Sequence, residues 1–379
     1  MIEHRNFPKL NIQTSLLGFG CMRFPTIMVD GENIIDEEQA QKMLDIAYQA
    51  GVNYFDTAYP YHGGKSEIFV GKVLDNYPRE SYFLATKLPI WELQKAEDIY
   101  QIFNEQLEKL NKTYVDFYLL HAMNHNYFEK VKQLNVIEKL KELKKQGKIK
   151  YIGFSFHDDY EVFNEIINYF DWDFCQIQFN YMDTEIQAGL KGLKLAESKN
   201  IPIIVMEPIK GGSLASLPLD VTTKFRQKHQ DWTDASWALR FVSSFENVKV
   251  ILSGMSSIEQ VKDNLNTFKN IKPLDKEDMQ IIKEVKEIIT KRVKNGCTAC
   301  RYCMPCPVGV DIPSNFAIWN DFSKYNNKVD TIRRINNLKN KNAFASVCVK
   351  CGKCEKLCPQ KLSIRHDLER VVIELDHLG

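Results

Sequence analysis

The segment Val115–Met123, VDFYLLHAM, is apolar at nearly every position and has the length of one buried strand. Strands of a parallel sheet read as such runs because both of their faces are covered. Seven further apolar runs occur along the chain, and they read LLGFGCMRF, VNYFDTA, YFLATKL, IKYIGFSF, FCQIQFN, IPIIVMEPI and VKVILSGM. Eight strand–helix units within about 270 residues predict an α/β fold of the closed (β/α)8 type, a TIM barrel.

Helical spacing fills the segments between these runs. Apolar residues recur every three or four positions over Ala40–Ala47 and over Ile99–Leu110, as on the buried face of a helix. Gly51 and Gly147 follow two such segments, where a left-handed residue commonly ends a helix. An open doubly wound sheet is the alternative, but no G-x-G-x-x-G motif leads from a strand into a helix.

Composition indicates a soluble globular protein of 379 residues, with 44% hydrophobic residues and a formal net charge of +1. This balance favours neither a nucleic-acid partner nor a membrane surface. The N-terminus MIEHRNFPKL lacks the apolar core of a signal peptide, and no apolar run reaches membrane-spanning length. We therefore expect a cytoplasmic protein.

Two domains are expected. The eighth barrel helix, near Ile258–Phe268, is followed by Pro273 and a charged helical stretch, KEDMQIIKEVKEIITKRVK. We place the barrel at residues 1–288 and a small α-rich, ferredoxin-like two-cluster domain at residues 289–379. Within the second domain, the polar spacer FSKYNNKVDTIRRINNLKN between two cysteine runs is predicted to be helical.

Eight of the ten cysteines lie in these two runs, CTACRYCMPC and CVKCGKCEKLCP. The second run has the C-x2-C-x2-C-x3-C-P spacing of bacterial ferredoxins, in which the fourth cysteine ligates the other cluster. We therefore expect two 4Fe–4S clusters. The first set of ligands is Cys297, Cys300, Cys303 and Cys358, and the second is Cys348, Cys351, Cys354 and Cys306.

Zinc is the alternative occupant, but zinc ribbons usually place two C-x2-C pairs well apart. The first run departs from the ferredoxin spacing, because two residues rather than three separate Cys303 from Cys306. Four lysines near the second run are expected to offset the negative charge of the clusters, and docking of an acidic, ferredoxin-type electron carrier is the alternative role. These lysines are Lys350, Lys353, Lys356 and Lys361.

Titratable residues stand at the ends of three consecutive apolar runs. The second run ends in Asp56 with Tyr61 just beyond it, the third ends in Lys87, and the fourth ends in His121. Barrel enzymes build their active sites at the C-terminal ends of the strands. Each residue alone would more often be structural, but four in register on successive strands predict a catalytic site.

This set of groups suits carbonyl reduction. Hydride attack on a carbonyl leaves an alkoxide that needs a proton, and tyrosine with a pKa of ~10 is a reluctant donor at neutral pH. A neighbouring ammonium should lower the pKa of Tyr61, at ~1.4 kcal/mol per unit. Asp56 would keep Lys87 charged, and His121 would orient the carbonyl oxygen.

The segments FDTAYPY, ATKL and LLHAM resemble the aldo-keto reductases, and the resemblance extends from about residue 8 to residue 270. It implies that Asp56, Tyr61, Lys87 and His121 form the catalytic tetrad of that family, with Tyr61 as the proton donor. It also implies a small-molecule aldehyde, ketone or quinone as substrate, and NAD(P)H bound across the mouth of the barrel.

The resemblance also assigns residues to the nicotinamide. Ser155 in IGFSF and Gln176 in CQIQFN match the positions that hold the carboxamide group. Gly20, Cys21 and Met22 match the loop that lines the nicotinamide ring.

Several positions depart from the family. Phe156 stands where the family often has Asn, and Met206 stands where an aromatic residue commonly stacks on the nicotinamide. Gly254 and Gln260 occupy positions where Lys or Arg usually grips the adenosine 2′-phosphate. Lys210, with the two glycines after it, is expected to contact the pyrophosphate instead.

Three functions therefore remain open. The first is a carbonyl oxidoreductase that uses NAD(P)H, with the clusters either relaying electrons or only bracing the barrel. The second is a reductase in which ferredoxin or a bound flavin replaces the nicotinamide, because a hydride carrier and a one-electron cluster normally need a flavin or similar intermediary. The third is a non-catalytic redox sensor on a reductase-like barrel, against which the four tetrad residues weigh.

Overall fold

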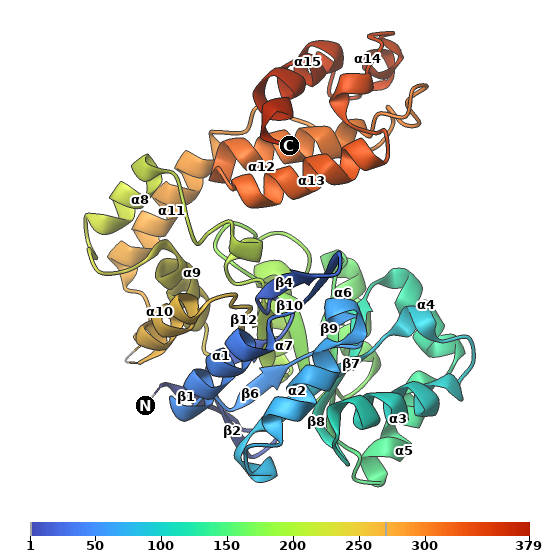
Figure 1. Ribbon diagram of the computed structural model, residues 1–379, viewed down its shortest axis with the longest axis vertical. Coiled ribbons are helices and arrows are strands. Elements are labelled where there is room, and N and C mark those ends of the chain that lie inside the picture. The colour runs from blue at the N-terminus through green and yellow to red at the C-terminus, as the bar shows by residue number, and fades with distance from the viewer. Residues whose placement is uncertain (1, 270) are drawn as a thin grey trace. The chain divides into compact units, whose positions relative to one another are not determined.

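The computed structural model describes residues 2–269 and 271–379 (Figure 1). Contacts divide the chain into two compact units, residues 1–211 with 235–275, and residues 212–234 with 276–379. The second unit therefore takes in an excursion of the chain between the seventh and eighth barrel strands. The proposed domain boundary at residue 288 lies inside a helix of this second unit.

Eight parallel strands close into a barrel in the first unit, in the order β10-β11-β12-β3-β6-β7-β8-β9. Each of the eight apolar runs supplies one strand, so the predicted (β/α)8 barrel is confirmed. The strands are β3 (Leu17–Gly20), β6 (Tyr54–Asp56), β7 (Phe83–Leu88), β8 (Val115–Met123), β9 (Ile149–Phe156), β10 (Phe174–Gln178), β11 (Ile203–Met206) and β12 (Val248–Ser253).

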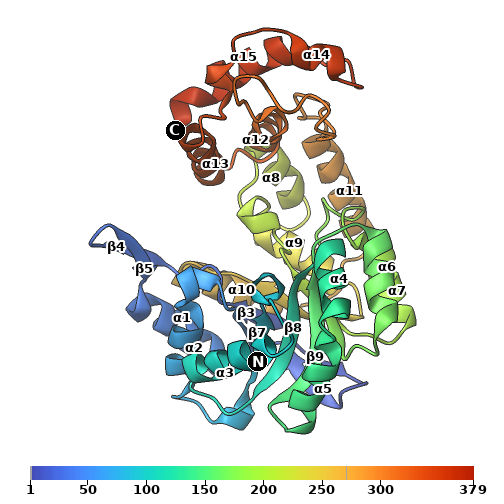
Figure 2. The same cartoon turned by 90° about the vertical axis from the view of Figure 1, so that its right-hand side faces the viewer.

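Amphipathic helices surround these strands, as Figure 2 shows from a second direction. They are α1 (Glu37–Gln49), α2 (Ser66–Leu74), α3 (Asp98–Leu110), α4 (His125–Gln133), α5 (Val136–Lys145), α6 (Tyr160–Tyr169), α7 (Gly189–Ser198), α9 (Asp234–Ser243) and α10 (Ile258–Phe268). The predicted apolar faces of α1 and α3 are buried. Gly51 and Gly147 follow α1 and α5 with φ angles of 102° and 73°, which confirms the expected left-handed ends.

Two hairpins precede the first helix. The pair β1 (His4–Phe7) and β2 (Ile12–Ser15) is antiparallel, and its Phe7 is fully buried in the core cluster that fills the barrel. The pair β4 (Thr26–Val29) and β5 (Glu32–Ile35) follows β3, is almost fully exposed and stands out from the barrel in Figure 2. The first hairpin therefore contributes to the core, whereas the second adds little buried surface.

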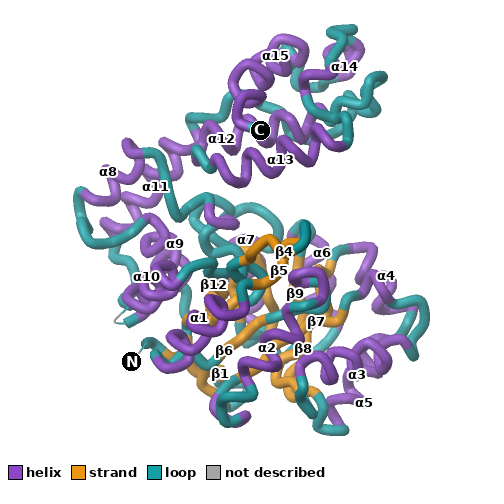
Figure 3. Tube along the Cα trace, viewed as in Figure 1, coloured by secondary structure: helices purple, strands orange, loops and turns teal. Residues whose placement is uncertain are grey.

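The second unit is helical (Figure 3). Its helices are α8 (Leu219–Arg226), α11 (Lys276–Thr290), α12 (Ile312–Tyr325), α13 (Lys328–Asn340), α14 (Lys353–Leu357) and α15 (Ile364–Leu375). The excursion helix α8 packs on α11, where Lys224 and Glu284 form an ion pair of 2.7 Å. The polar spacer is helical as predicted, but it breaks between α12 and α13 because Asn326 is left-handed, with φ at 52°.

A buried apolar cluster holds α12, α13 and α15 together. Its members include Val310, Phe316, Trp319, Ile335, Leu368 and Val371. Six of the eight cysteines of the two runs pack against this cluster as partly buried neighbours. Over the two described ranges, no helix has both the length and the apolar character that crossing a membrane requires.

Candidate functional site

The register of the barrel brings three predicted residues to one face. Asp56 pairs with Ala85, and Lys87 lies two residues further along the same strand. Lys87 in turn pairs with Leu119, and His121 lies two residues beyond it. Since residues two apart in a strand share a face, all three side chains point the same way at the C-terminal ends of β6, β7 and β8.

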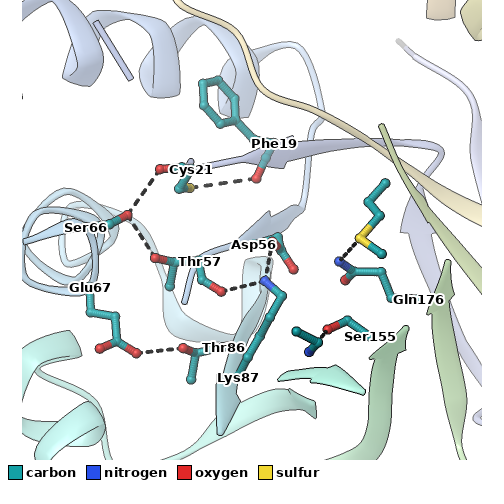
Figure 4. Close-up of polar contacts among 12 residues, drawn as sticks. Phe19, Cys21, Asp56, Thr57, Ser66, Glu67, Thr86, Lys87, Ser155 and Gln176 are labelled. Atoms are coloured by element: carbon teal, nitrogen blue, oxygen red, sulfur yellow. Dashed lines mark hydrogen bonds and ion pairs between the residues drawn. The ribbon is translucent and has the colours of Figure 1, made fainter. Parts of the chain in front are cut away.

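Lys87 is completely buried and lies at the centre of this group. Its Nζ donates to Asp56 Oδ1 at 2.6 Å and to the carbonyl oxygen of Thr57 at 2.8 Å (Figure 4). Burial opposes the ammonium form, but Asp56 and Tyr61 outweigh it and raise the pKa of Lys87 above its usual value. The lysine is therefore charged at neutral pH.

Tyr61 opens a short 3-10 turn, Tyr61–Gly64, just beyond β6. Its ring centroid lies 5.0 Å from Lys87 Nζ, so phenol and ammonium are adjacent. Burial is the largest influence on this phenol, and it raises the pKa of Tyr61 although Lys87 lowers it. The expectation that the ammonium leaves the phenol more acidic than usual is therefore wrong: desolvation of the phenolate outweighs the attraction of Lys87.

His121 completes the group. Its ring packs edge-on against Tyr61 with centroids 6.1 Å apart, and it lies 5.1 Å from the ring of Trp91. Burial, followed by the charges of Lys87 and His157, places the pKa of His121 well below its usual value. The imidazole is therefore neutral at pH 7, and its Nδ1 has no hydrogen-bond partner among the described residues.

Ser155 and Gln176 face each other on neighbouring strands, β9 and β10. Ser155 Oγ accepts the backbone N–H of Ala122 at 2.8 Å, which leaves its hydroxyl hydrogen free to donate. Gln176 Nε2 donates to the sulfur of Met206 at 3.4 Å, while the buried Gln176 Oε1 lacks a partner within the described chain. One free donor and one unsatisfied buried acceptor fit the oxygen and the NH2 group of a carboxamide.

The loop after β3 borders the same site. Cys21 is fully buried, and its backbone N–H donates to the carbonyl oxygen of Asp56 at 2.8 Å. Ser66 Oγ donates to the Cys21 carbonyl oxygen at 3.2 Å (Figure 4). Gly20 lies beside the end of β12, where a Cβ on it would be 3.4 Å from the backbone of Ser253, and the side chain of Met22 is 54% exposed. The loop is thus fixed against the tetrad, with one apolar side chain free for a ligand.

The residues expected at the phosphates are less suited to that role. Lys210 forms an ion pair of 2.6 Å with the buried Asp183, so its charge is largely neutralised. Gln260 Oε1 accepts the backbone N–H of Ser256 at 2.7 Å at the start of α10, and Gly254 carries no side chain. Phe156 is buried at the end of β9 and packs on Phe163 of α6.

A buried polar network lies behind Lys87, and the sequence did not predict it. Glu67 Oε1 accepts from Thr86 Oγ1 at 2.6 Å and from Gln106 Nε2 at 2.8 Å, and Gln106 Nε2 also donates to the carbonyl oxygen of Lys87 at 3.0 Å. Burial raises the pKa of Glu67. Both Glu67 and Gln106 lie on helices, where a polar side chain normally signals a solvated face, so only their contacts reveal them.

The eight clustered cysteines surround two cavities in the second unit. One cavity is lined by Cys297, Cys300, Cys303 and Cys358. The other is lined by Cys306, Cys348, Cys351 and Cys354, with Cys303 at the border between them. The structure thus brings together the same two sets that the ferredoxin spacing predicts, and all ten cysteines of the chain are free of disulfides.

Within residues 2–269 and 271–379, no three Cys, His, Asp or Glu side chains are grouped closely enough to hold a single metal ion. Each cavity is bordered by the four cysteines of one predicted set, and four is the number of ligands that one 4Fe–4S cluster takes.

Comparisons with known proteins identify a family for each of the two parts of the chain. A model of the aldo/keto reductase family matches residues 16–287, and a model of the 4Fe-4S dicluster domain matches residues 296–362. L-galactose dehydrogenase of Arabidopsis thaliana is 26% identical over 315 residues, covering 78% of this chain and 96% of that protein. NADH-specific methylglyoxal reductase of Escherichia coli is 25% identical over 289 residues, covering 65% of this chain and 86% of that protein.

A solved structure shows the same barrel. The holo form of aldo-keto reductase AKR11C1 from Bacillus halodurans superposes with a TM-score of 0.64 at 26% sequence identity. The match covers 75% of this chain and 96% of that protein.

Removing the Asp56 carboxylate should destabilise the folded chain, because Lys87 would then be a buried charge without a partner. We expect Asp56→Asn to lower the free energy of unfolding by roughly 3–5 kcal/mol, because it leaves a buried charge without its partner. Urea unfolding followed by circular dichroism measures this change. The exposed pair Lys72–Glu37, also 2.6 Å long, is the control, and Glu37→Gln should leave stability nearly unchanged. Equal effects of the two substitutions would mean that the buried pair contributes no more to stability than the exposed one.

The lowered pKa of His121 predicts a loss of stability in acid. Its unfolded-state pKa is about 6.5, so below that pH the unfolded chain binds a proton that the folded chain does not. Stability should therefore fall from about pH 7 to about pH 5, by at most ~1.4 kcal/mol per pH unit for this group. Urea unfolding at several pH values should show a shallower fall for His121→Gln. An unchanged slope would mean that His121 titrates normally.

Proposed function

The chain belongs to the aldo/keto reductase family, and we propose that it reduces a small-molecule carbonyl compound by hydride transfer from NADH or NADPH. The observation that carries this proposal is the contact of Lys87 with both Asp56 and Tyr61 at the C-terminal rim of the barrel. The free Ser155 hydroxyl hydrogen and the unpartnered Gln176 Oε1 lie on the same rim and support nicotinamide as the cofactor's reactive end.

When bound, NADH or NADPH supplies the hydride that reduces the carbonyl carbon. Tyr61 then breaks its O–H bond and gives the proton to the oxygen, so that the product is an alcohol. The raised pKa of Tyr61 keeps this phenol protonated until the alkoxide forms. Lys87 stabilises the phenolate that is left, and Asp56 keeps Lys87 charged and in place.

His121 has a separate role in this scheme. Because its lowered pKa leaves it neutral, it cannot offer a positive charge to the substrate. A neutral imidazole has one N–H, and this group can donate a hydrogen bond to the carbonyl oxygen and fix its orientation beside Tyr61. The ring of Trp91 packs beside His121 and offers an apolar surface to the substrate.

The C-terminal cysteines are proposed to hold two 4Fe–4S clusters that relay single electrons. Cys297, Cys300 and Cys303 would share the first with Cys358, which reaches them from the second run. The second would be held by the remaining four cysteines, with Cys306 supplied by the first run. The two runs would thus be cross-linked through iron, which ties the segments on either side of α12 and α13 together.

A second candidate is a reductase that receives electrons from an acidic ferredoxin-type carrier, with a flavin in place of nicotinamide. It is favoured by the pairing of Lys210 with Asp183, which removes a cation from the phosphate end of the site. It is also favoured by three exposed lysines around the second cysteine run that have no ion-pair partner among the described residues. These are Lys353, Lys356 and Lys361.

Tyr61→Phe separates proton donation from binding. We expect turnover of an aldehyde or quinone with NADH or NADPH to fall about 10²–10⁴-fold, because the proton donor is lost. Nucleotide affinity, measured by fluorescence titration of anaerobic protein, should change little. Tyr59→Phe is the matched control, because the Tyr59 hydroxyl bonds Glu105 at 3.2 Å rather than the tetrad.

Two outcomes would decide against the first candidate. Full activity of Tyr61→Phe would remove this residue from the chemistry. Turnover by the wild type with reduced viologen, but with neither nucleotide, would instead favour the carrier-fed reductase.

Metal analysis tests the cysteine centre. Anaerobic protein should hold about eight iron and eight sulfide per chain, and Cys358→Ser should lower both to about four. If Cys358 and Cys297 share one cluster, the double variant Cys358→Ser/Cys297→Ser should lose no more iron than either single variant. The double variant Cys358→Ser/Cys354→Ser should lose nearly all of its iron, because it removes a ligand from each cluster. Cys175→Ser, at a buried barrel thiol, is the control. Stoichiometric zinc in place of iron would refute the assignment.

A further inference from the structure

The loops after the seventh and eighth strands of a (β/α)8 barrel frequently form a phosphate-binding site. In this chain those strands are β11 and β12, and the loops that follow them contain Gly211 and Gly254. Neither glycine has a side chain, and Lys210 in the first of these loops is already paired with Asp183. A cation for a phosphate must therefore come from another part of the barrel.

Arg23 reaches both loops from a third direction. It follows the loop at the end of β3, and a side chain placed on Gly254 would begin 2.7 Å from its Cγ and 3.0 Å from its Cβ. Its terminal nitrogen Nη2 lies 3.8 Å from the position that a Cβ on Gly211 would occupy. The arginine therefore runs across the glycine of the eighth-strand loop, with its guanidinium beside the glycine of the seventh-strand loop.

The position of Arg23 depends on these contacts. Ser256 Oγ donates to the Arg23 carbonyl oxygen at 2.7 Å, which ties the arginine backbone to the loop after β12. Any side chain at Gly254 would collide with the arginine stem, so glycine is what permits this path. Arg23 is thus held by the loops on which a phosphate would lie.

The guanidinium of Arg23 is available to bind an anion. The side chain is exposed, and no carboxylate of residues 2–269 or 271–379 forms an ion pair with it. Lys210, by contrast, is neutralised at 2.6 Å by Asp183. A guanidinium offers a planar pair of donors that matches two phosphate oxygens, and an unpaired one loses no existing ion pair when a phosphate binds. The N-terminus of α10, which begins at Ile258 just after this loop, adds a favourable dipole.

We propose that Arg23 binds a phosphate group of the nicotinamide nucleotide and supplies the cation that Gly254, Gln260 and the paired Lys210 do not. This inference rests on the proposed function, since it takes the nucleotide as the ligand. One short segment would then serve both ends of the cofactor, because Cys21 binds the backbone of Asp56 and Arg23, two residues later, extends to the loops after β11 and β12.

Fluorescence titration of the full-length anaerobic protein with NADH and with NADPH tests this role. Arg23→Gln should raise the Kd about tenfold or more, the usual effect of losing a hydrogen bond to a charged group. Equal weakening for both nucleotides would place Arg23 on the pyrophosphate, and weakening for NADPH alone would place it on the 2′-phosphate. Wild-type affinity should also fall with added salt more steeply than that of Arg23→Gln.

Lys145→Gln is the matched control, because Lys145 is exposed at the end of α5, near the N-terminal end of β9 and hence at the opposite end of the barrel. It should leave both Kd values unchanged. If the wild type binds a nucleotide and Arg23→Gln binds it equally well, the inference is overturned while the proposed function stands. If the wild type binds neither NADH nor NADPH, the proposed function itself fails and the inference falls with it.

Discussion

The ion pair between Lys87 and Asp56 is the constraint on which the rest of the barrel site depends. Both side chains are almost completely removed from water, and a buried charge without a partner would cost several kcal/mol. The ammonium therefore needs its carboxylate within hydrogen-bond distance, and the carboxylate must come from the strand next door. The register of β6 against β7 provides this, because Asp56 lies opposite Ala85, two residues before Lys87. The strand register that closes the barrel therefore also provides the buried ammonium with its carboxylate partner.

The same burial bears on the proposed role of Tyr61 as a proton donor, because it leaves the phenol less acidic than usual. Desolvation holds the proton on the hydroxyl, and the adjacent ammonium becomes important only when negative charge appears on the oxygen. A preorganised cation of this kind costs no reorganisation at the moment of reaction, since Asp56 and the Thr57 carbonyl already fix it. The network of Glu67 and Gln106 adds support from behind, because Gln106 binds the backbone carbonyl of Lys87 itself. Lys87 is therefore the residue to which Asp56, Thr57 and Gln106 are all bound.

Periodicity and spacing predicted the barrel well, since each of its strands lies in a largely apolar run and helical spacing begins again after it. They also predicted which titratable residues end those strands. They could not predict the sign of the pKa change at Tyr61, which depends on how completely the folded chain excludes water. Nor could they identify Arg23 or Glu67: an exposed arginine in a loop and a glutamate on a helix look ordinary until their contacts are known. The break at Asn326 was missed because Asn adopts left-handed backbone without a distinctive neighbouring pattern.

The two kinds of redox chemistry proposed for this chain place opposite demands on exposure, and their candidate sites lie in different units. Hydride transfer needs a site from which water is excluded, and Lys87, Asp56 and Ser155 are each at most 3% exposed. Exchange of single electrons with another protein needs a cluster edge near the surface. Each predicted ligand set includes one exposed cysteine, Cys300 in the first and Cys351 in the second. Each cluster would therefore have an edge open to an external carrier. This exposure is the observation in favour of the proposed electron relay, rather than of clusters that only stabilise the fold.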